Sequence, residues 1–207
     1  MHGEAPGNCA VECRPPDIVV NLQPTISWRG DRASLFLLEP RHVAEPYVKW
    51  LRDPNVIQYL ESRFEVHDLS STIAYVTRMR ADPDVLMLGV HSLDLDRHVG
   101  NIKLGPINRR HGLGEIGLMI GERDAWGRGI ATDAVNVLAQ IAAHQLSIRK
   151  LTASCYASNV ASERVFSKAG FAVEARLKDY YLLDDRPEDL VLMARYVDSA
   201  SARGALR

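Results

Sequence analysis

Cysteine is scarce, net charge is nearly absent and long apolar runs are missing, and each shortage excludes a class of protein. The three cysteines, Cys9, Cys13 and Cys155, are too few for a disulfide framework and lack the second ligand pair of a zinc site. The 25 basic and 26 acidic residues nearly cancel, so no overall field attracts nucleic acid or an anionic membrane. There is no run of about eighteen apolar residues and no signal-peptide pattern. We therefore expect a cytoplasmic protein with no metal, nucleic-acid or membrane partner.

Length and composition fit one globular domain with short extensions. A chain of 207 residues with 46% hydrophobic content can bury a sizeable core. Residues 1–17 are rich in Gly, Pro and Cys without periodicity, which predicts a flexible N-terminal arm. Residues 199–207 predict a second frayed end, a C-terminal tail. We place the folded domain at residues 18–198.

Apolar periodicity predicts a mixture of strands and helices within this domain. Strands are expected at residues 34–38, 85–93, 99–104, 115–120, 150–155, 172–177 and 191–197. Helices are expected at residues 41–52, at about 69–80, at 130–144, and from 159 to a C-terminus marked by Gly170. The three closely spaced middle strands suit an antiparallel meander, and residues 115–155 suit a strand–helix–strand unit. The pattern is that of an α+β (α/β) domain.

Residues 122–131 (ERDAWGRGIA) combine a strand end, two glycines and an immediate helix start. This arrangement suits anion binding, because free N–H groups of the first helical turn and the helix dipole both face the loop. Gly127 and Gly129 would let a phosphate approach the backbone, and Arg128 could add positive charge. A purely structural turn is the alternative. No Gly-Lys-Ser/Thr follows, and the third glycine of a dinucleotide fingerprint is missing.

A family resemblance rests on this turn together with later segments. Residues 126–132 (WGRGIAT), the following helix and strand, residues 159–162 (NVAS) and residues 168–171 (KAGF) resemble the GNAT acetyltransferases, specifically their RimJ/RimL-like branch. The resemblance covers about residues 28–196. It implies the GNAT fold, with a mixed, mostly antiparallel central sheet that is splayed at the cofactor site and flanked by about four helices.

The same resemblance implies acetyl-CoA as co-substrate, without a metal. Its pyrophosphate would be held mainly by the backbone of the turn. The family pattern carries Gln or Arg three residues before the first glycine, where this chain has Asp124, so the Asp124 carboxylate must point away from the phosphates. The implied cofactor contacts are Leu118, Met119, Ile120, Trp126, Gly127, Arg128, Gly129, Ile130, Ala131, Thr132, Asn159 and Phe166.

Acetyl transfer to an amine needs a proton acceptor, because amines are mostly protonated at neutral pH. Glu115 begins the strand before the turn, and strand alternation places it on one face with Gly117 and Met119. It resembles a family position that serves as base in some members, with an ordinary solvent-facing glutamate as the alternative. Glu61, in the loop between the first two helices, is a second candidate, since family substrates meet that loop.

The departing thiolate needs a proton, and the developing oxyanion needs a donor. Asn159, Ser162 and Phe166 share one helix face, which by resemblance runs along the pantetheine arm. Phe166 stands where many family members carry a tyrosine acid, and Ser162 stands where RimJ/RimL-like members carry a serine. Ser162 is therefore the expected acid, although Asn159 and Ser162 could also be only helix-capping residues. We expect the oxyanion donor to be a backbone N–H near Leu118 or Met119.

The acceptor contacts are predicted from a loop and from the start of a late strand. Glu61, Arg63 and Tyr181 are the expected substrate contacts, with exposed loop charges and a strand-entry aromatic as the alternatives. Residues 60–64 (LESRF) resemble members that act on amino sugars or nucleotide amino sugars, where Arg63 could meet a phosphate. A protein N-terminus, received by acidic residues at 184–189, is the second reading, and a non-catalytic acyl-CoA-binding module is the third. We leave a homodimer open.

Overall fold

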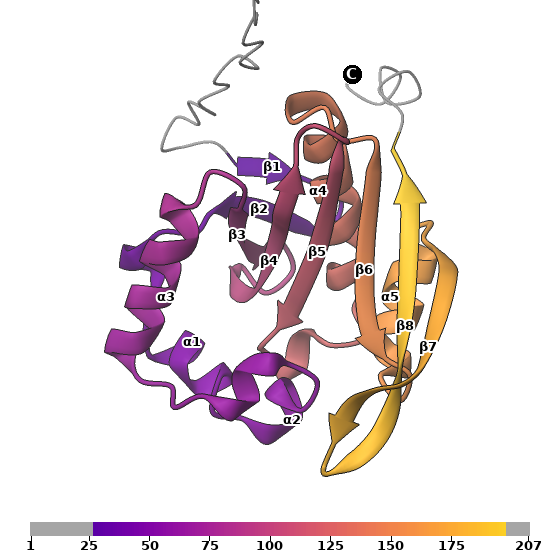
Figure 1. Cartoon of the computed structure of the whole chain (residues 1–207). Coiled ribbons are helices and arrows are strands. Elements are labelled where there is room, and N and C mark those ends of the chain that lie inside the picture. The colour runs from indigo at the N-terminus through magenta and orange to yellow at the C-terminus, as the bar shows by residue number, and fades with distance from the viewer. Residues whose placement is uncertain (1–26, 198–207) are drawn as a thin grey trace, which may run out of the picture.

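The computed structural model describes residues 27–197 of the chain, so the predicted N-terminal arm and C-terminal tail lie outside the described residues. A single sheet of eight strands forms the centre of the molecule (Figure 1). The strands are β1 (Ser27–Arg29), β2 (Ala33–Leu37), β3 (Leu86–Ser92), β4 (Arg97–Asn108), β5 (Leu113–Ile120), β6 (Lys150–Tyr156), β7 (Ala172–Leu183) and β8 (Arg186–Tyr196).

Five α-helices surround this sheet within residues 27–197, where the sequence predicts about four. They are α1 (Glu45–Trp50), α2 (Pro54–Ile57), α3 (Leu69–Ala81), α4 (Ile130–Gln145) and α5 (Val160–Lys168). Short 3-10 helices are η1 (Pro40–His42), η2 (Glu61–Phe64) and η3 (Arg123–Ala125). The single helix predicted at residues 41–52 is wrong in extent: η1 and α1 replace it, and α2 follows. Pro46 and Pro54 each lie in a first helical turn, because proline supplies no N–H for continuing a preceding helix.

The sheet is mixed and mostly antiparallel, as the sequence and its family resemblance predict. The strand order is β1-β2-β3-β4-β5-β6-β8-β7, and β5 with β6 form the parallel pair within it. Helix α4 makes the crossover between these two strands, which a parallel connection requires. Every other neighbouring pair in the order is antiparallel.

The parallel pair is joined over only a short length. Residues Leu113–Glu115 of β5 pair with Lys150–Thr152 of β6, and both strands continue beyond this region without pairing to each other. Figure 1 shows the two strands running apart from their paired ends. The predicted splay of the sheet is therefore present, and it leaves backbone groups of β5 facing a gap.

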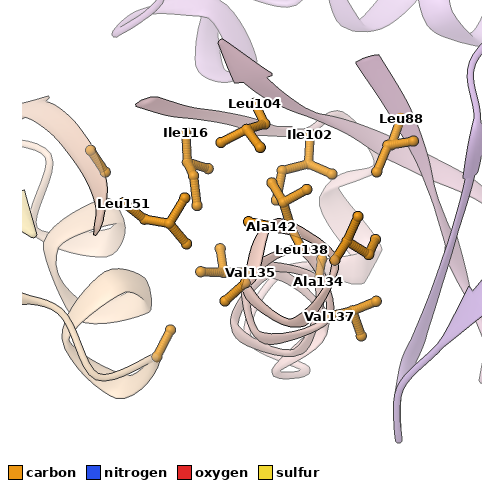
Figure 2. Close-up of a cluster of buried hydrophobic side chains, with 14 of the residues drawn as sticks. Leu88, Ile102, Leu104, Ile116, Ala134, Val135, Val137, Leu138, Ala142 and Leu151 are labelled. Carbon is orange, nitrogen blue, oxygen red and sulfur yellow. The ribbon is translucent and has the colours of Figure 1, made fainter. Parts of the chain in front are cut away.

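Helices cover both faces of the sheet and form two apolar clusters. The larger cluster packs α4 against the middle strands, and Figure 2 shows Leu138 and Ala142 of α4 beside Ile102 and Ile116 of the sheet. The smaller cluster joins α1 and α3 to β3, with Trp50 as one of its largest members. None of the helices between residues 27 and 197 is long and apolar enough to cross a membrane.

The last two strands form a hairpin that is longer than predicted. The turn residues Asp184 and Asp185 have φ angles of 50° and 61°, which short acidic side chains tolerate and which a tight hairpin turn requires. Strand β7 includes a register shift between Leu177 and Tyr181. The residues beyond Leu177 are mostly polar or exposed, so apolar alternation gives no signal of this extension.

Candidate active site

A cavity of about 560 Å³ opens where β5 and β6 diverge. Its wall comes from β4, β5, β6 and β7, helices α1, α3 and α5, and the segment of residues 59–67. Segments far apart in the sequence therefore meet at one hollow. It is lined by all three predicted catalytic residues and several predicted contacts: Glu61, Glu115, Leu118, Met119, Asn159, Ser162, Phe166 and Tyr181.

The glycine turn before α4 has the conformation that anion binding needs, although it lies outside the cavity lining. Gly127 and Gly129 have φ angles of 75° and 78°, in the left-handed region that favours glycine. A Cβ added to Gly127 would meet no protein atom within 4 Å, so space lies open above the turn. Gly129 is the N-cap of α4 and provides no side-chain cap. The first N–H groups of α4 are thus accessible from the loop.

Arginine side chains surround this turn, and one of them neutralises the Asp124 carboxylate. The Asp124 carboxylate forms an ion pair with Arg97 at 2.6 Å, and Arg128 Nε donates to the Asp124 carbonyl oxygen at 2.6 Å. The side chain of Arg32 lies beside Gly129, because a Cβ there would be 3.3 Å from Arg32 Cδ. Arg32 comes from the β1–β2 turn, far away in sequence, so motif spacing alone could not identify it.

Asp133, in the first turn of α4, ties the β1–β2 turn to the start of this helix. Its Oδ2 accepts hydrogen bonds from the backbone N–H groups of Arg32 at 2.8 Å and Ala33 at 2.9 Å. An acidic residue in the first turn is also favourable for the helix dipole. Trp126 Nε1 donates to the carbonyl oxygen of Ile120 at 2.8 Å, which joins the turn to the end of β5.

Backbone alternation along β5 determines which peptide groups face the gap. Gly121 N–H donates to Val99 O of β4. The backbone N–H and C=O groups of Gly121, and of every second residue before it, including Met119, therefore point toward β4. The Ile120 carbonyl points the opposite way, toward Trp126. By the same alternation, the N–H of Leu118 faces the gap between β5 and β6. Of the two predicted oxyanion positions, Leu118 therefore has its N–H on the open side.

The two predicted carboxylates differ in how strongly their neighbours hold them. Glu115 accepts a hydrogen bond from Ser154 Oγ at 3.1 Å. Glu61 accepts from the Tyr156 hydroxyl at 2.9 Å and lies 3.7 Å from Arg63 Nη1. Burial raises the pKa of Tyr156, the hydrogen bond from Arg63 opposes the rise, and Glu61 adds to it. Sequence reasoning missed Tyr156, since its position at the end of a buried strand suggests only core packing.

Arg63 anchors the loop and does not line the cavity. Its guanidinium donates to Leu60 O at 3.0 Å, to the Tyr156 hydroxyl at 2.9 Å and to Leu182 O at 3.1 Å. This joins η2 to the β7–β8 hairpin. Tyr181 stacks on Tyr156 with ring centroids 4.3 Å apart. Burial raises the pKa of Tyr181, and the nearby Glu61 and Glu115 charges act in the same direction.

Helix α5 presents the predicted face to the cavity. Asn159 is the N-cap, and its Oδ1 accepts from Ser162 N–H at 3.1 Å. Phe166 is buried with 3% exposure, and Ser162 is partly exposed. Burial raises the pKa of the neighbouring Cys155 thiol, Glu163 adds to the rise, and a hydrogen bond from Ser162 opposes it. Cys155 is thus kept as a thiol beside the candidate acid.

Among residues 27–197, no group of three His, Cys, Asp or Glu side chains could hold a metal ion.

A family model described as an acetyltransferase (GNAT) domain matches residues 34–172. An uncharacterized N-acetyltransferase p20 of Bacillus licheniformis is 22% identical over 153 residues, covering 73% of this chain and 85% of that protein. The ribosomal-protein-serine acetyltransferase of Escherichia coli strain K12 is 31% identical over 104 residues, covering 50% of this chain and 58% of that protein.

Solved structures share the fold at low sequence identity. RimL, a ribosomal L7/L12 α-N-protein acetyltransferase in complex with coenzyme A, has a TM-score of 0.75 at 18% identity and covers 84% of this chain and 99% of that one. The microcin C7 self-immunity acetyltransferase MccE, with acetyl-CoA and AMP, has a TM-score of 0.71 at 20% identity and covers 81% and 93%. The spermidine N-acetyltransferase of Vibrio cholerae, with CoA and spermine, has a TM-score of 0.70 at 18% identity and covers 80% and 95%.

Proposed function

This chain belongs to the GNAT acetyltransferase family, and from that premise we propose that its cavity brings acetyl-CoA and a primary amine together for direct acetyl transfer. The observation that carries the proposal is the gap between β5 and β6, which has Ser162 and two carboxylates, Glu61 and Glu115, in one lining. A proton acceptor, an outward-facing N–H and a proton donor are then available in one space. No covalent acyl-enzyme is required.

The turn before α4 fits the pyrophosphate of acetyl-CoA. Its left-handed glycines leave room for close approach, and Arg32 and Arg128 contribute positive charge nearby. Asp124 places an acidic side chain in this motif, but its ion pair with Arg97 offsets the negative charge beside the proposed phosphate position. Pantetheine would pass between the strands along α5. The proposed cofactor contacts remain Leu118, Met119, Ile120, Trp126, Gly127, Arg128, Gly129, Ile130, Ala131, Thr132, Asn159 and Phe166.

In the proposed reaction, Glu115 takes a proton from the amine directly or through water, and the free amine attacks the thioester carbonyl carbon. The Leu118 N–H donates to the oxygen that becomes negative in the tetrahedral intermediate. The carbon–sulfur bond then breaks, and Ser162 donates its proton to the departing thiolate. The second proton released by the attacking nitrogen returns to Ser162 through water, which leaves a neutral amide and restores the hydroxyl. We assign the base to Glu115 because Glu61 is held by Tyr156 and Arg63. Glu61 would instead hold the protonated acceptor.

For the acceptor, we propose an amino sugar or a nucleotide amino sugar. The cavity lining carries three carboxylates, Glu61, Glu65 and Glu115, against one lysine, Lys103, which favours a cationic amine. Tyr181 adds an aromatic ring and a hydroxyl to the same wall. The sequence predicts that Arg63 contacts a phosphate of the acceptor. Its guanidinium instead donates to the Tyr156 hydroxyl and to Leu182 O, so we propose that Arg63 positions the cavity wall that Tyr181 forms.

A protein N-terminus is the alternative acceptor, favoured by the similarity to the Escherichia coli ribosomal-protein-serine acetyltransferase. The acidic groove suggested for it receives little support. Glu188 accepts from Ser158 N–H at 2.7 Å and Asp189 accepts from Asp179 N–H at 2.9 Å, so both carboxylates are used within the hairpin region. Asp184 and Asp185 are left at the exposed turn.

Thiol release from acetyl-CoA, measured with amino sugars, nucleotide amino sugars, polyamines and short peptides, tests the proposal. Fast release with amino sugars and slow release with peptides would support the preferred acceptor, and the reverse order would replace it with the alternative. Binding of acetyl-CoA without turnover on any amine would instead favour a non-catalytic acyl-CoA-binding module.

A further inference from the structure

The cavity floor on the α1–α3 side of the sheet contains a polar group that the proposed reaction does not use. Asn101 and Lys103 of β4 lie in register with Met119 and Gly117 of β5, so their side chains share a face with Glu115. All five residues line the cavity. The floor is open at Gly117, because a Cβ there would have only Lys103 Cε within 4 Å, at 3.8 Å.

The Asn101 amide is buried, yet its nitrogen has no partner. Asn101 is 4% exposed, and its Nδ2 is the one buried side-chain nitrogen or oxygen without a hydrogen bond among residues 27–197. An unpaired buried donor is costly to the folded protein, because it loses its hydrogen bond to water without gaining another. A donor left unpaired at the wall of a cavity is positioned to bind an acceptor atom of a ligand.

His98 fixes the orientation of this amide. His98 Nε2 lies 2.8 Å from Gly100 O and 3.0 Å from Asn101 Oδ1, and both atoms are acceptors, so Nε2 carries the proton. Turning the amide over would set its NH2 group against that donor. The His98 ring is itself held edge-on by Phe36 and Trp50, with centroids 5.2 Å and 5.0 Å away. The amide NH2 is thereby directed away from His98.

We propose that Asn101 Nδ2 and Lys103 Nζ form an oxygen-binding subsite that selects amines carrying a hydroxyl oxygen close to the reacting nitrogen. Lys103 is partly buried, and none of the hydrogen bonds or ion pairs found within residues 27–197 involves its Nζ, so its three donors are available. This inference rests on the proposed acetyl transfer and gives it a substrate class. A polyamine has no oxygen for the subsite and adds a positive charge beside Lys103, so it is disfavoured.

The test uses two amines that differ only by one hydroxyl, trans-2-aminocyclohexanol and cyclohexylamine. The wild-type protein should show a kcat/KM about three- to tenfold higher for the hydroxylated amine, as one neutral hydrogen bond allows. Asn101→Leu, which keeps a similar volume and removes one of the two donors, should lower the ratio without changing the KM for acetyl-CoA. Asn108→Leu makes the same change at an exposed position outside the cavity lining and should keep the wild-type ratio.

Two kinetic results overturn the subsite. One is an equal kcat/KM for the two amines in the wild-type protein. The other is an equal loss for both amines in Asn101→Leu, which would give Asn101 a part in the acetyl transfer itself. Lys103→Met supplies a second variant, should the leucine variant fail to fold, and it too should lower the ratio. An unchanged ratio there removes the lysine from the subsite.

Binding separates failure of this inference from failure of the proposed function. Absence of acetyl transfer to every amine in the panel would end the proposed function. Calorimetric titration of both amines into the CoA-loaded protein still measures the subsite, with tighter binding of the hydroxylated amine expected. Equal affinities would overturn the subsite even if transfer to other amines is fast.

Discussion

At the scale of single residues, the candidate acid has the strongest positional support. Ser162 lies on the cavity face of α5 with its backbone N–H already bonded to Asn159. The Asn159 side chain thus has the capping role that the sequence left open, and this leaves the Ser162 hydroxyl free for other partners. The Cys155 thiol lies in the same cavity lining as this hydroxyl.

Ser162→Ala should lower kcat by about a hundredfold or more, because general acid catalysis typically contributes that much. The KM and dissociation constant for acetyl-CoA should change little, since no phosphate contact is lost. Steady-state kinetics with calorimetric acetyl-CoA binding would measure both. Ser167→Ala, on an exposed position of the same helix and outside the cavity lining, is the matched control. An unchanged kcat in Ser162→Ala would exclude the role.

The two carboxylates should separate by kinetic signature. Glu115→Gln should lower kcat by about a hundredfold or more and leave acceptor KM nearly unchanged, since it removes the proposed base. Glu61→Gln should mainly raise the acceptor KM, because its carboxylate is proposed to hold the charged amine. Initial rates over a range of acceptor concentrations distinguish these effects. The opposite pattern would exchange the two roles.

Sequence reasoning found residues that share a helix face more easily than residues that share a sheet face. Helical spacing alone grouped Asn159, Ser162 and Phe166, and all three line the cavity. Asn101 and Tyr156 escaped, because strand alternation gives two faces without saying which one meets the acceptor. Sequence reasoning also missed His98. Its contact with Asn101 depends on the bulge in the β3–β4 pairing, which no local sequence pattern indicates.

At the scale of elements, the start of α4 combines a helix N-terminus with two left-handed glycines. Gly129→Asp should abolish measurable acetyl-CoA binding, because it sets a Cβ and a negative charge at the proposed pyrophosphate position. Equilibrium binding of acetyl-CoA to the purified variant measures this.

Gly170→Asp is a matched control for that change. Gly170, which follows the end of α5, also has a left-handed backbone, with φ of 81°. A Cβ added there would have Arg195 as its nearest neighbour, at 3.8 Å. Both variants should lose a similar and small amount of stability, because aspartate tolerates the left-handed region better than most residues do. Only Gly129→Asp should lose acetyl-CoA. Equal affinity in both variants would refute the phosphate assignment.

The elements themselves were largely predictable where one face is apolar. The helix predicted at residues 130–144 is observed as α4 to within one residue at its end, because its apolar stripe packs on the sheet. β1 and the outer half of the β7–β8 hairpin were not predicted. Their residues are mostly exposed or polar, so pairing depends on partner strands and turn geometry that local patterns do not contain.

At the scale of the whole molecule, the sheet separates two proposed binding regions and its splay connects them. The turn before α4 and the helix α5 provide the side proposed for acetyl-CoA. Helices α1 and α3 with the loop at η2 provide the side proposed for the acceptor. The parallel pairing stops after Glu115, so this carboxylate lies where the sheet opens between the two regions. If β5 and β6 were paired along their full length, the Leu118 N–H would be hydrogen-bonded to β6, and the thioester could not enter between the two strands.

The layer of α1 and α3 against the sheet should also make global stability depend on pH just below 6.5. Burial lowers the pKa of His98 and of His42 below the ordinary value of 6.5, although hydrogen bonds from His98 to Asn101 and Gly100 partly oppose this. The unfolded chain therefore binds more protons than the folded chain in the window just below pH 6.5. Stability from these histidines is complete above that value and is lost as the pH falls through the window.

Urea unfolding at several pH values should show the free energy of unfolding decreasing from pH 7 to pH 5.5. His98→Gln should reduce this slope, since glutamine does not titrate and can still donate toward Asn101. His144→Gln, on an exposed position of α4, should keep the wild-type slope. The lowered pKa values of Asp53 and Asp68 act below their ordinary value of 3.8, so they do not mask the result. Identical slopes in the wild type and His98→Gln would mean that the buried ring does not govern acid sensitivity.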